Sequence, residues 1–365
     1  MKKIIAVVLM LSLMVSCFAG CAKKDNNSSV FSAPIIVSEP ENIEVSQYAV
    51  NPLTGTETMD KSALKLKPVA IMINNVSTAW PVQASLSKAD VVYETYVEGG
   101  ITRLLAVFKD VRTVGSQKIG SLRSGRYSYV DLALGHGAQF VHAGLDEDYC
   151  LPHIREVGTT TVDLNTDGSR SNVIGGYSCA ERISNGLSWE HTLYTTGTDL
   201  YKKLKSSVGL KLSNEQENWM NFVEEGKEYT PDGGKAESVV IPFSGSYCTA
   251  EFKYDKEDET YYKYRNGTIQ GDYGDKDAKI NFENVLALYS DVTYFPDNKH
   301  VKTHLESGTG YYISRGGYRE INWSKGAASE PIKITDSEGN EIDYNSGRTY
   351  VCFTKNSNKA TTTFQ

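Results

Sequence analysis

The periodicity of the apolar residues changes near residue 235, and this change restricts the possible folds more than any other feature of the chain. Before it, short apolar runs alternate with segments in which apolar residues recur every three or four positions. After it, apolar and polar residues alternate within short runs. Because a period near 3.6 favours helices and a period of two favours half-buried strands, we expect an α+β protein. An N-terminal α/β sheet domain over 45–234 should precede a mostly β C-terminal domain over 235–365.

The N-terminal region contains repeated strand, helix, strand units, which favour a sheet with helices packed on it. The segment Glu98-Gly99-Gly100 joins two of the strands and supplies the positive-φ residues of a tight hairpin. The expected strands are 68–74, 90–97, 102–110, 118–122, 138–142 and 159–164, and the expected helices are 124–134, 146–157 with Asp146 as its cap, and 199–207.

The C-terminal region consists of short strands separated by turn residues such as Asn266-Gly267. A sandwich, a partly open barrel and a curled sheet are all compatible with this spacing. The expected strands are 239–243, 250–254, 260–264, 285–293, 311–314, 317–323 and 349–354.

The first 20 residues have the pattern of a secretory signal. Two lysines precede an apolar run over 4–18, which is shorter than the ~20 residues that span a bilayer, and the run ends in Ala19-Gly20-Cys21. Small residues directly before a cysteine indicate a lipoprotein signal, cleaved so that Cys21 is lipidated. Cys17 is a rival lipidation site, but the polar segment 21–44 reads as a flexible tether after Cys21. We therefore expect a protein anchored by lipid on the extracytoplasmic face of a bacterial cell membrane.

The charge of the chain bears on its partners. Loss of residues 1–20 removes Lys2 and Lys3 and leaves 36 basic against 45 acidic residues, a net charge of −9. A chain of this sign has no broad field that attracts nucleic acid or anionic lipid. We expect contact with the membrane through the lipid anchor, a cell-wall component or another envelope protein as partner, and no nucleic acid.

Four cysteines follow the tether, and their pairing is open. An exported chain could join them in three complete pairings, but a fold of this size is stable without disulfides. Buried free thiols are the favoured interpretation for Cys150, Cys179, Cys248 and Cys352.

The strongest candidate site is Gly120-Ser121-Leu122-Arg123-Ser124-Gly125-Arg126, between an expected strand and an expected helix. Backbone N–H groups at a helix start attract anions, and arginines bind carboxylate or phosphate in a forked geometry. The alternative is an ion-pair network in which the arginines pair with Glu94, Glu98 or Asp131, and such networks are the more usual arrangement. The predicted anion pocket comprises Arg103, Arg123, Ser124, Arg126 and His142.

Acid/base chemistry is a weaker hypothesis. Glu94, Glu98, His142 and His191 could form a cluster that transfers protons near neutral pH, although such histidines more often hydrogen-bond a loop. Ser124 lies outside any G-x-S-x-G elbow, so serine hydrolysis is disfavoured.

Metal signals are also weak. Asp163, Asn165 and Asp167 repeat the first half of a calcium loop, but Ile174 occupies the twelfth position, where a glutamate is needed, so a solvated turn is favoured. His300 and His304 with Glu306 do not complete a zinc ligand set. No cofactor is expected.

Several motifs resemble the YerB-type bacterial lipoproteins, a family without an established biochemical function. The resemblance implies an exported two-domain lipoprotein and no particular reaction. The motifs are Asn51-Pro52-Leu53-Thr54-Gly55, Ile71-Met72-Ile73-Asn74-Asn75, Asp90-Val91-Val92-Tyr93-Glu94, Val97-Glu98-Gly99-Gly100-Ile101-Thr102-Arg103, Ile119-Gly120-Ser121-Leu122-Arg123-Ser124-Gly125-Arg126 and Val141-His142-Ala143-Gly144.

The chain departs from that family pattern at three places. The usual Asp-Asn and Ala-Arg-Pro are replaced by Asn74-Asn75 and Ala79-Trp80-Pro81, and the usual Pro-His-Asn retains only His191. Loss of an acid and a base together is nearly neutral if they pair in relatives.

Two classes of function remain. A non-enzymatic envelope module that binds a ligand or partner is favoured, because no nucleophile elbow, triad order or Cys/His signature is visible. The alternative is a cell-wall-acting hydrolase or transferase that uses a Glu/His cluster, since two acids need only meet in space.

Overall fold

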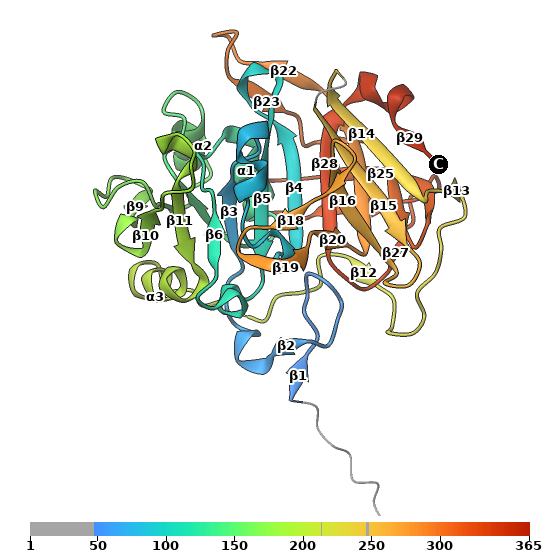
Figure 1. Cartoon of the computed structure of the whole chain (residues 1–365), viewed down its shortest axis with the longest axis horizontal. Helices are drawn as coiled ribbons and strands as arrows, with labels where there is room; N and C mark the ends of the chain where they lie inside the picture. The colour runs from blue at the N-terminus through green and yellow to red at the C-terminus, as the bar shows by residue number, and fades with distance from the viewer. Residues whose placement is uncertain (1–46, 213, 246–247) are drawn as a thin grey trace, which may run out of the picture. The chain divides into compact units, whose positions relative to one another are not determined.

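The computed structural model describes residues 47–212, 214–245 and 248–365 (Figure 1). The expected signal over 1–20, the expected lipidation site Cys21 and the expected tether over 21–44 lie outside the described residues. The segment Ser46–Gln365 is one compact unit. It is built mostly of strands, in mixed sheets.

A 12-stranded mixed sheet runs through both regions of the sequence in the order β13-β25-β24-β21-β28-β4-β5-β3-β7-β8-β9, with β26 also paired to β25. The strand β28 lies between β21 and β4 and runs parallel to both. The bounds are β3 (Val69–Ile73), β4 (Val91–Tyr96), β5 (Thr102–Phe108), β7 (Gln139–His142), β8 (Thr161–Asp163), β9 (Val173–Gly175), β13 (Gly234–Lys235), β21 (Asn284–Ser290), β24 (Ser307–Ser314), β25 (Gly317–Lys325), β26 (Ile332–Thr335) and β28 (Thr349–Lys355).

A six-stranded sheet has the order β17-β16-β15-β14-β29, with β20 paired to β16, and a three-stranded sheet has the order β10-β11-β6. Two-stranded pairs complete the strand content. The bounds are β14 (Ser238–Ser244), β15 (Cys248–Asp255), β16 (Thr260–Arg265), β17 (Thr268–Ile269), β20 (Asn281–Phe282), β29 (Thr363–Phe364), β6 (Lys118–Gly120), β10 (Ala180–Arg182), β11 (Leu193–Thr196), and the pairs β1 (Tyr48–Ala49) with β2 (Met59–Asp60), β12 (Asn221–Phe222) with β27 (Asp343–Tyr344), β18 (Gly271–Asp272) with β19 (Asp275–Lys279), and β22 (Val292–Tyr294) with β23 (Val301–Thr303).

The α-helices of the described residues are α1 (Tyr127–Leu134), α2 (Cys150–Glu156) and α3 (Gly197–Ser207). The helix α2 begins four residues after Asp146, the expected cap. The Asp146 carboxylate accepts hydrogen bonds from the backbone N–H groups of Asp148, Tyr149 and Cys150. These local bonds compete with helical ones, so the acid organises the turn that leads into the helix.

The hairpin between β4 and β5 has the backbone that its sequence predicts. Gly99 and Gly100 have φ values of 75° and 71°. The expected strand over 285–293 is instead divided, because the chain leaves the main sheet after β21 and forms the separate pair β22 and β23.

Apolar residues fill both faces of the 12-stranded sheet. On one face, the six-stranded sheet contributes Phe252 and Phe282, whose rings each meet the Tyr350 ring of β28 edge-on at 5.1 Å. The other face packs against α1 and α2 through buried residues such as Tyr129 and Ile154. The two sheets therefore form a layered packing in which β28 contributes to the shared core. The four cysteines within the described residues are free thiols.

Candidate functional site

The arginines of the predicted anion pocket are engaged by acids or by the backbone. Arg126 forms a two-pronged ion pair with Glu98, in which its Nε is 2.7 Å from Oε1 and its Nη2 is 2.9 Å from Oε2. Arg123 Nη2 lies 2.9 Å from Glu190 Oε2. Arg103 is buried and donates to the backbone oxygen of Ser124 at 2.7 Å. This arrangement joins the β4–β5 hairpin to the segment that precedes α1.

Repulsion acts within this arginine cluster. Burial, together with the neighbouring guanidiniums of Arg126 and Arg123, lowers the pKa of Arg103 to about 9. Glu98 and Glu190 offset two of the three positive charges, so the cluster retains one excess cation.

The four candidate acid/base residues lie in separate surroundings. His142 is buried and its Nε2 is 2.9 Å from Thr161 Oγ1, and burial lowers its pKa. His191 Nδ1 is 2.7 Å from Asn74 Nδ2, and its Nε2 is 3.5 Å from Glu190 Oε1. Glu98 is held by Arg126, as described above, and the Glu94 carboxylate is fully buried. The structure brings His191 near Glu190 and Arg123, but it does not bring the four candidates together.

The oxygens of the calcium-like segment accept hydrogen bonds from protein donors. Asp163 Oδ1 accepts the N–H groups of Gly144 and Asn165. Asn165 Oδ1 accepts from Arg182, and Asp167 Oδ1 accepts from the N–H of Ser178. The three side chains therefore each bond to a different part of the chain and stabilise the loop.

A buried polar network centred on Glu94 links the two regions of the sequence. Glu94 accepts hydrogen bonds from Asn75 Nδ2 at 2.8 Å, from Thr102 Oγ1 at 2.7 Å and from the Tyr350 hydroxyl. The Lys263 ammonium lies 3.6 Å from Glu94 Oε2, and both side chains are fully buried. Lys263 Nζ also lies over the Tyr350 ring, 4.3 Å from its centroid.

The network continues to the surface through Arg265. Its Nη2 donates to Asn75 Oδ1 at 2.9 Å and lies 4.0 Å from Glu94 Oε1. Gln83 donates to the same Asn75 oxygen and accepts from Gln270. These bonds fix the side chains in position, and Lys263 Nζ, Arg265 Nε and Gln270 Oε1 are left without a hydrogen bond among the described residues.

Arg265 and Gln270 also line a pocket of about 540 Å³, here named the junction pocket. The Trp80 ring covers the Arg265 guanidinium, with 4.6 Å between the guanidinium carbon and the ring centroid. Asp272 accepts three hydrogen bonds from Ser85 and Ser87 and holds the loop beside the pocket. The lining residues are Ser77, Trp80, Pro81, Arg265, Asn266, Thr268, Ile269, Gln270, Gly271, Asp272, Tyr273 and Lys276.

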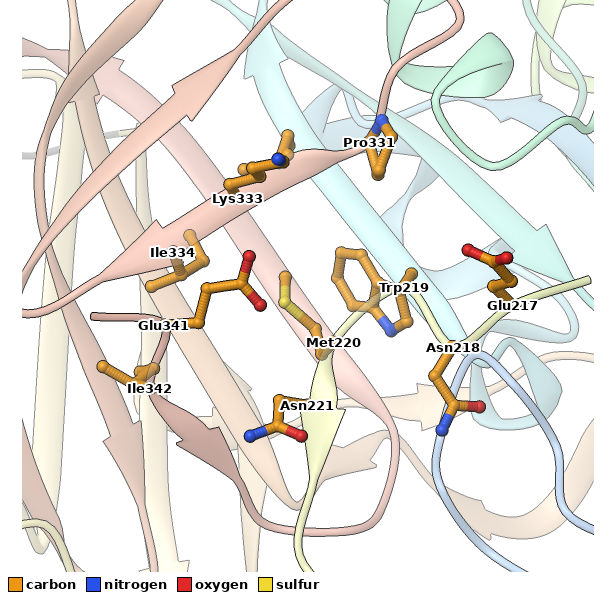
Figure 2. Close-up of a pocket in the computed structure, with 11 residues that line it drawn as sticks. Glu217, Asn218, Trp219, Met220, Asn221, Pro331, Lys333, Ile334, Glu341 and Ile342 are labelled. Carbon is orange, nitrogen blue, oxygen red and sulfur yellow. The ribbon is translucent and has the colours of Figure 1, made fainter. Parts of the chain in front are cut away.

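A second depression of about 370 Å³, here named the β26 groove, lies between β26 and the segment 217–221 (Figure 2). Trp219 and Met220 form one wall, and Lys333 and Ile334 of β26 face them. Trp219 donates its Nε1 hydrogen to the backbone oxygen of Leu53 at 2.8 Å, so this wall is fixed.

Comparison with known families resolves the identity of these two regions. The N-terminal domain of DUF3048, a protein family of unknown function, matches residues 53–211, and its C-terminal domain matches residues 239–351. The chain belongs to the DUF3048 family. The "Putative lipoprotein YerB" of Bacillus subtilis (strain 168) is 26% identical over 316 residues, which cover 82% of this chain and 84% of that protein.

The fold is shared with a solved structure. The crystal structure of the YerB protein from Bacillus subtilis matches with a TM-score of 0.70 at 23% identity, covering 87% of this chain and 99% of that chain. The resemblance to YerB-type proteins that the sequence motifs indicated is thereby confirmed.

The sequence motifs did not identify the junction pocket. Its Trp80 occupies one of the places where this chain departs from the family pattern, and another, Asn74, directly precedes Asn75 of the polar network. These departures from the family pattern were the sequence signal that could have indicated the pocket. The partner Arg265 comes from β16 in the other family domain, and no local pattern connects the two.

Proposed function

We propose that this protein is a lipoprotein, anchored through Cys21 on the extracytoplasmic face of the cell membrane, that binds a ligand of the cell envelope without catalysing a reaction. The signal pattern at residues 1–21 supports the anchor, as does the name of the relative, "Putative lipoprotein YerB". Among the described residues, no helix is long and apolar enough to cross a membrane.

The junction pocket is the observation that carries the binding function. Ligand sites favour the boundary between domains, and this pocket is lined by residues of both family domains. Its Arg265 is held from behind by Asn75 and covered by Trp80, so its geometry is set before any ligand arrives. A preorganised cation loses little entropy on binding.

The lining favours an anionic glycan fragment. Trp80 and Tyr273 offer aromatic faces, and Lys276 adds a second cation. Sugar rings pack on aromatic faces, and a carboxylate or phosphate pairs with the cations. The nearby acid Asp272 is occupied by backbone and hydroxyl donors. Fragments of cell-wall glycan that carry carboxylates, such as muropeptides, combine these chemical groups.

The predicted arginine pocket supports binding less well, because Arg126 and Arg123 are already paired with Glu98 and Glu190, whereas Lys276 of the junction pocket is exposed. The alternative of a wall-acting hydrolase or transferase rests on His191 beside Glu190 and Arg123. The other candidate acids and bases each have different partners, which favours the binding module.

Calorimetric titration of the full-length protein in detergent with a purified muropeptide tests the proposal. Trp80→Ala should weaken binding about tenfold, since an aromatic contact contributes ~1 kcal/mol or more. Trp189→Ala is the matched control, because Trp189 also covers a guanidinium, that of Arg182, but lies outside the pocket. Equal affinity of the Trp80→Ala variant and the wild type, or no heat from the wild type, would refute the assignment.

A further inference from the structure

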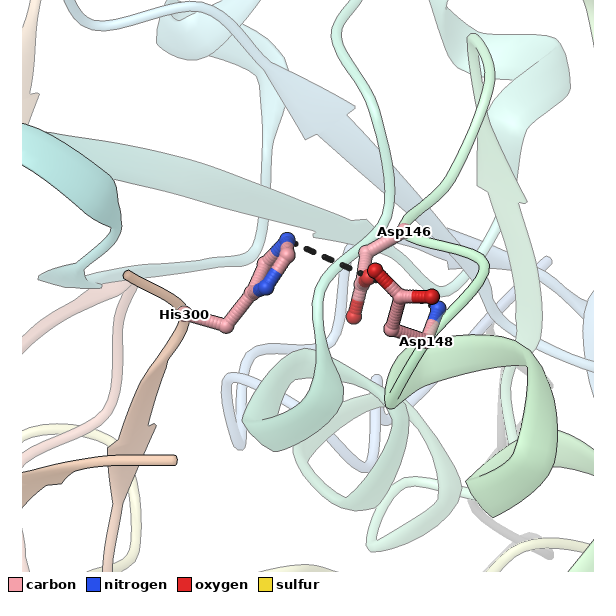
Figure 3. A group of neighbouring side chains, drawn as sticks. All are labelled: Asp146, Asp148 and His300. Atoms are coloured by element: carbon pink, nitrogen blue, oxygen red, sulfur yellow. Dashed lines mark hydrogen bonds and ion pairs between the residues drawn. The ribbon is translucent and has the colours of Figure 1, made fainter. Parts of the chain in front are cut away.

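Three metal-ligating side chains from distant parts of the sequence meet beside α2 (Figure 3). Asp146 and Asp148 come from the loop before α2, and His300 comes from the turn between β22 and β23. One ligand atom from each lies within 4.8 Å of the others. His300 Nε2 is 3.2 Å from Asp146 Oδ1.

A fourth side chain orients the imidazole. Asp297 Oδ2 lies 2.5 Å from His300 Nδ1, and Asp297 Oδ1 accepts the N–H groups of Lys299 and His300 at 3.0 Å. A carboxylate on one ring nitrogen holds the proton there and leaves the lone pair of the other nitrogen for a metal. Only 8% of His300 is exposed, and its Nε2 faces Asp146 Oδ1.

Burial and exposure divide the roles of the two aspartates. Asp146 is 7% exposed and is fixed by N–H donors from the loop, whereas Asp148 is exposed. A fixed carboxylate and a fixed imidazole form a rigid pair, and an exposed carboxylate can adjust to an arriving ion. The exposed side also leaves room for water as a further ligand.

The spacing fits a small tetrahedral ion. Two ligand atoms that are each ~2.1 Å from a zinc ion at a tetrahedral angle lie ~3.4 Å apart, close to the 3.2 Å between His300 Nε2 and Asp146 Oδ1. An imidazole with two carboxylates suits zinc better than calcium, which prefers six to eight oxygens. We infer that Asp146, Asp148 and His300 form a zinc site with an open position for water.

This site goes beyond the proposed binding function and stands on separate residues. Its ligands come from both family domains, at 146–148 and at 300, so an ion there connects them. The competing arrangement without metal is a protonated His300 bridging Asp146 and Asp297. The two arrangements differ in their response to zinc and to the loss of Asp148, which takes no part in the bridge.

Metal binding by the full-length protein tests the inference. After treatment with chelator, the protein is titrated with Zn²⁺ in a calorimeter, with Mn²⁺ and Ca²⁺ as comparison ions, and the metal retained after dialysis is counted by mass spectrometry. One Zn²⁺ per chain should bind, more tightly than Ca²⁺. Asp148→Asn should weaken Zn²⁺ binding at least tenfold, and Asp297→Asn should weaken it by ~10–100-fold as an outer partner of the ligand.

Glu147→Gln is the matched control, since Glu147 is an exposed acid next to the ligands that pairs with Arg170 instead. It should bind zinc as the wild type does. Because Asp148 is exposed, its substitution leaves the apo protein folded, and the melting temperature without metal verifies this. Absence of stoichiometric Zn²⁺ binding in the wild type, or unchanged binding in both Asp148→Asn and His300→Ala, would overturn the zinc site and favour the histidine bridge.

Discussion

The ion pair between Glu94 and Lys263 provides a sharp test of how the buried network stabilises the fold. Glu94 Oε2 is 3.6 Å from Lys263 Nζ, and Glu94 Oε1 is 4.0 Å from Arg265 Nη2. With an effective dielectric constant of ~20, these separations correspond to attractions of about 5 and about 4 kcal/mol. Each buried ion also loses several kcal/mol of hydration.

The substitutions Glu94→Gln and Lys263→Met should therefore have unequal effects. Lys263→Met removes one attraction but also removes the desolvation of the ammonium, and Glu94 keeps Arg265 and its three hydrogen-bond donors. We expect a loss of ~1–3 kcal/mol. Glu94→Gln removes both attractions and leaves two buried cations, and a loss of ~3–5 kcal/mol is expected.

The double variant gives a prediction of opposite sign. In the Glu94→Gln background, Lys263 is an uncompensated buried cation, so Lys263→Met should raise the free energy of unfolding there although it lowers it in the wild type. Equilibrium urea unfolding at pH 7, followed by tryptophan fluorescence, measures all four proteins. The reasoning fails if Lys263→Met lowers the free energy of unfolding equally in both backgrounds.

Three further predictions follow from single positions. Cys21→Ala should release the protein from membranes on fractionation, and an uncut variant retained there would contradict lipidation. Burial and Lys325 lower the pKa of His136 to about 3. Because the unfolded state takes up the proton first, the free energy of unfolding should fall by up to ~1.4 kcal/mol per pH unit from pH 6.5 toward pH 3. The fall should be less steep in His136→Phe, and unfolding measured as a function of pH checks this. Gly308→Ala should lower the melting temperature by several degrees, since an added Cβ would lie 2.2 Å from the backbone oxygen of Tyr289; an unchanged temperature would show that the strands shift freely.

Much of the secondary structure could be predicted from local patterns. Val69–Ile73 is a continuous apolar run and forms a wholly buried strand, and the hairpin glycines at 99 and 100 have positive φ. The pairing of β28 with β4 could not be predicted, because a parallel contact between distant strands leaves no turn signal in the sequence.

The candidate sites show the same division between local and distant contacts. The pairing of Arg126 with Glu98 could be predicted as the alternative to an anion pocket, since an arginine and a glutamate near short turns often pair. The two cationic partners of Glu94, Lys263 and Arg265, lie on β16, far along the chain, and no local pattern distinguishes Glu94 from another strand carboxylate. The Asp297–His300 contact is local, but Asp146 meets it only through the fold. Sequence patterns identify residues whose side chains could take part in binding or catalysis. Tertiary packing decides which of them come into contact.

The position of β28 has a consequence for the order of folding. Thr95 on β4 bonds to Phe353 across 258 residues of sequence, so the central sheet closes only after nearly the whole chain is available. Strand pairings of such long range form slowly, and until then β4 and β21 present open edges that invite association with other chains. A chain shortened before Thr349 would retain most of its residues. It would lack β28, the strand that joins β4 to β21 in the 12-stranded sheet. Its nascent form is therefore the stage at which a chaperone would be needed most.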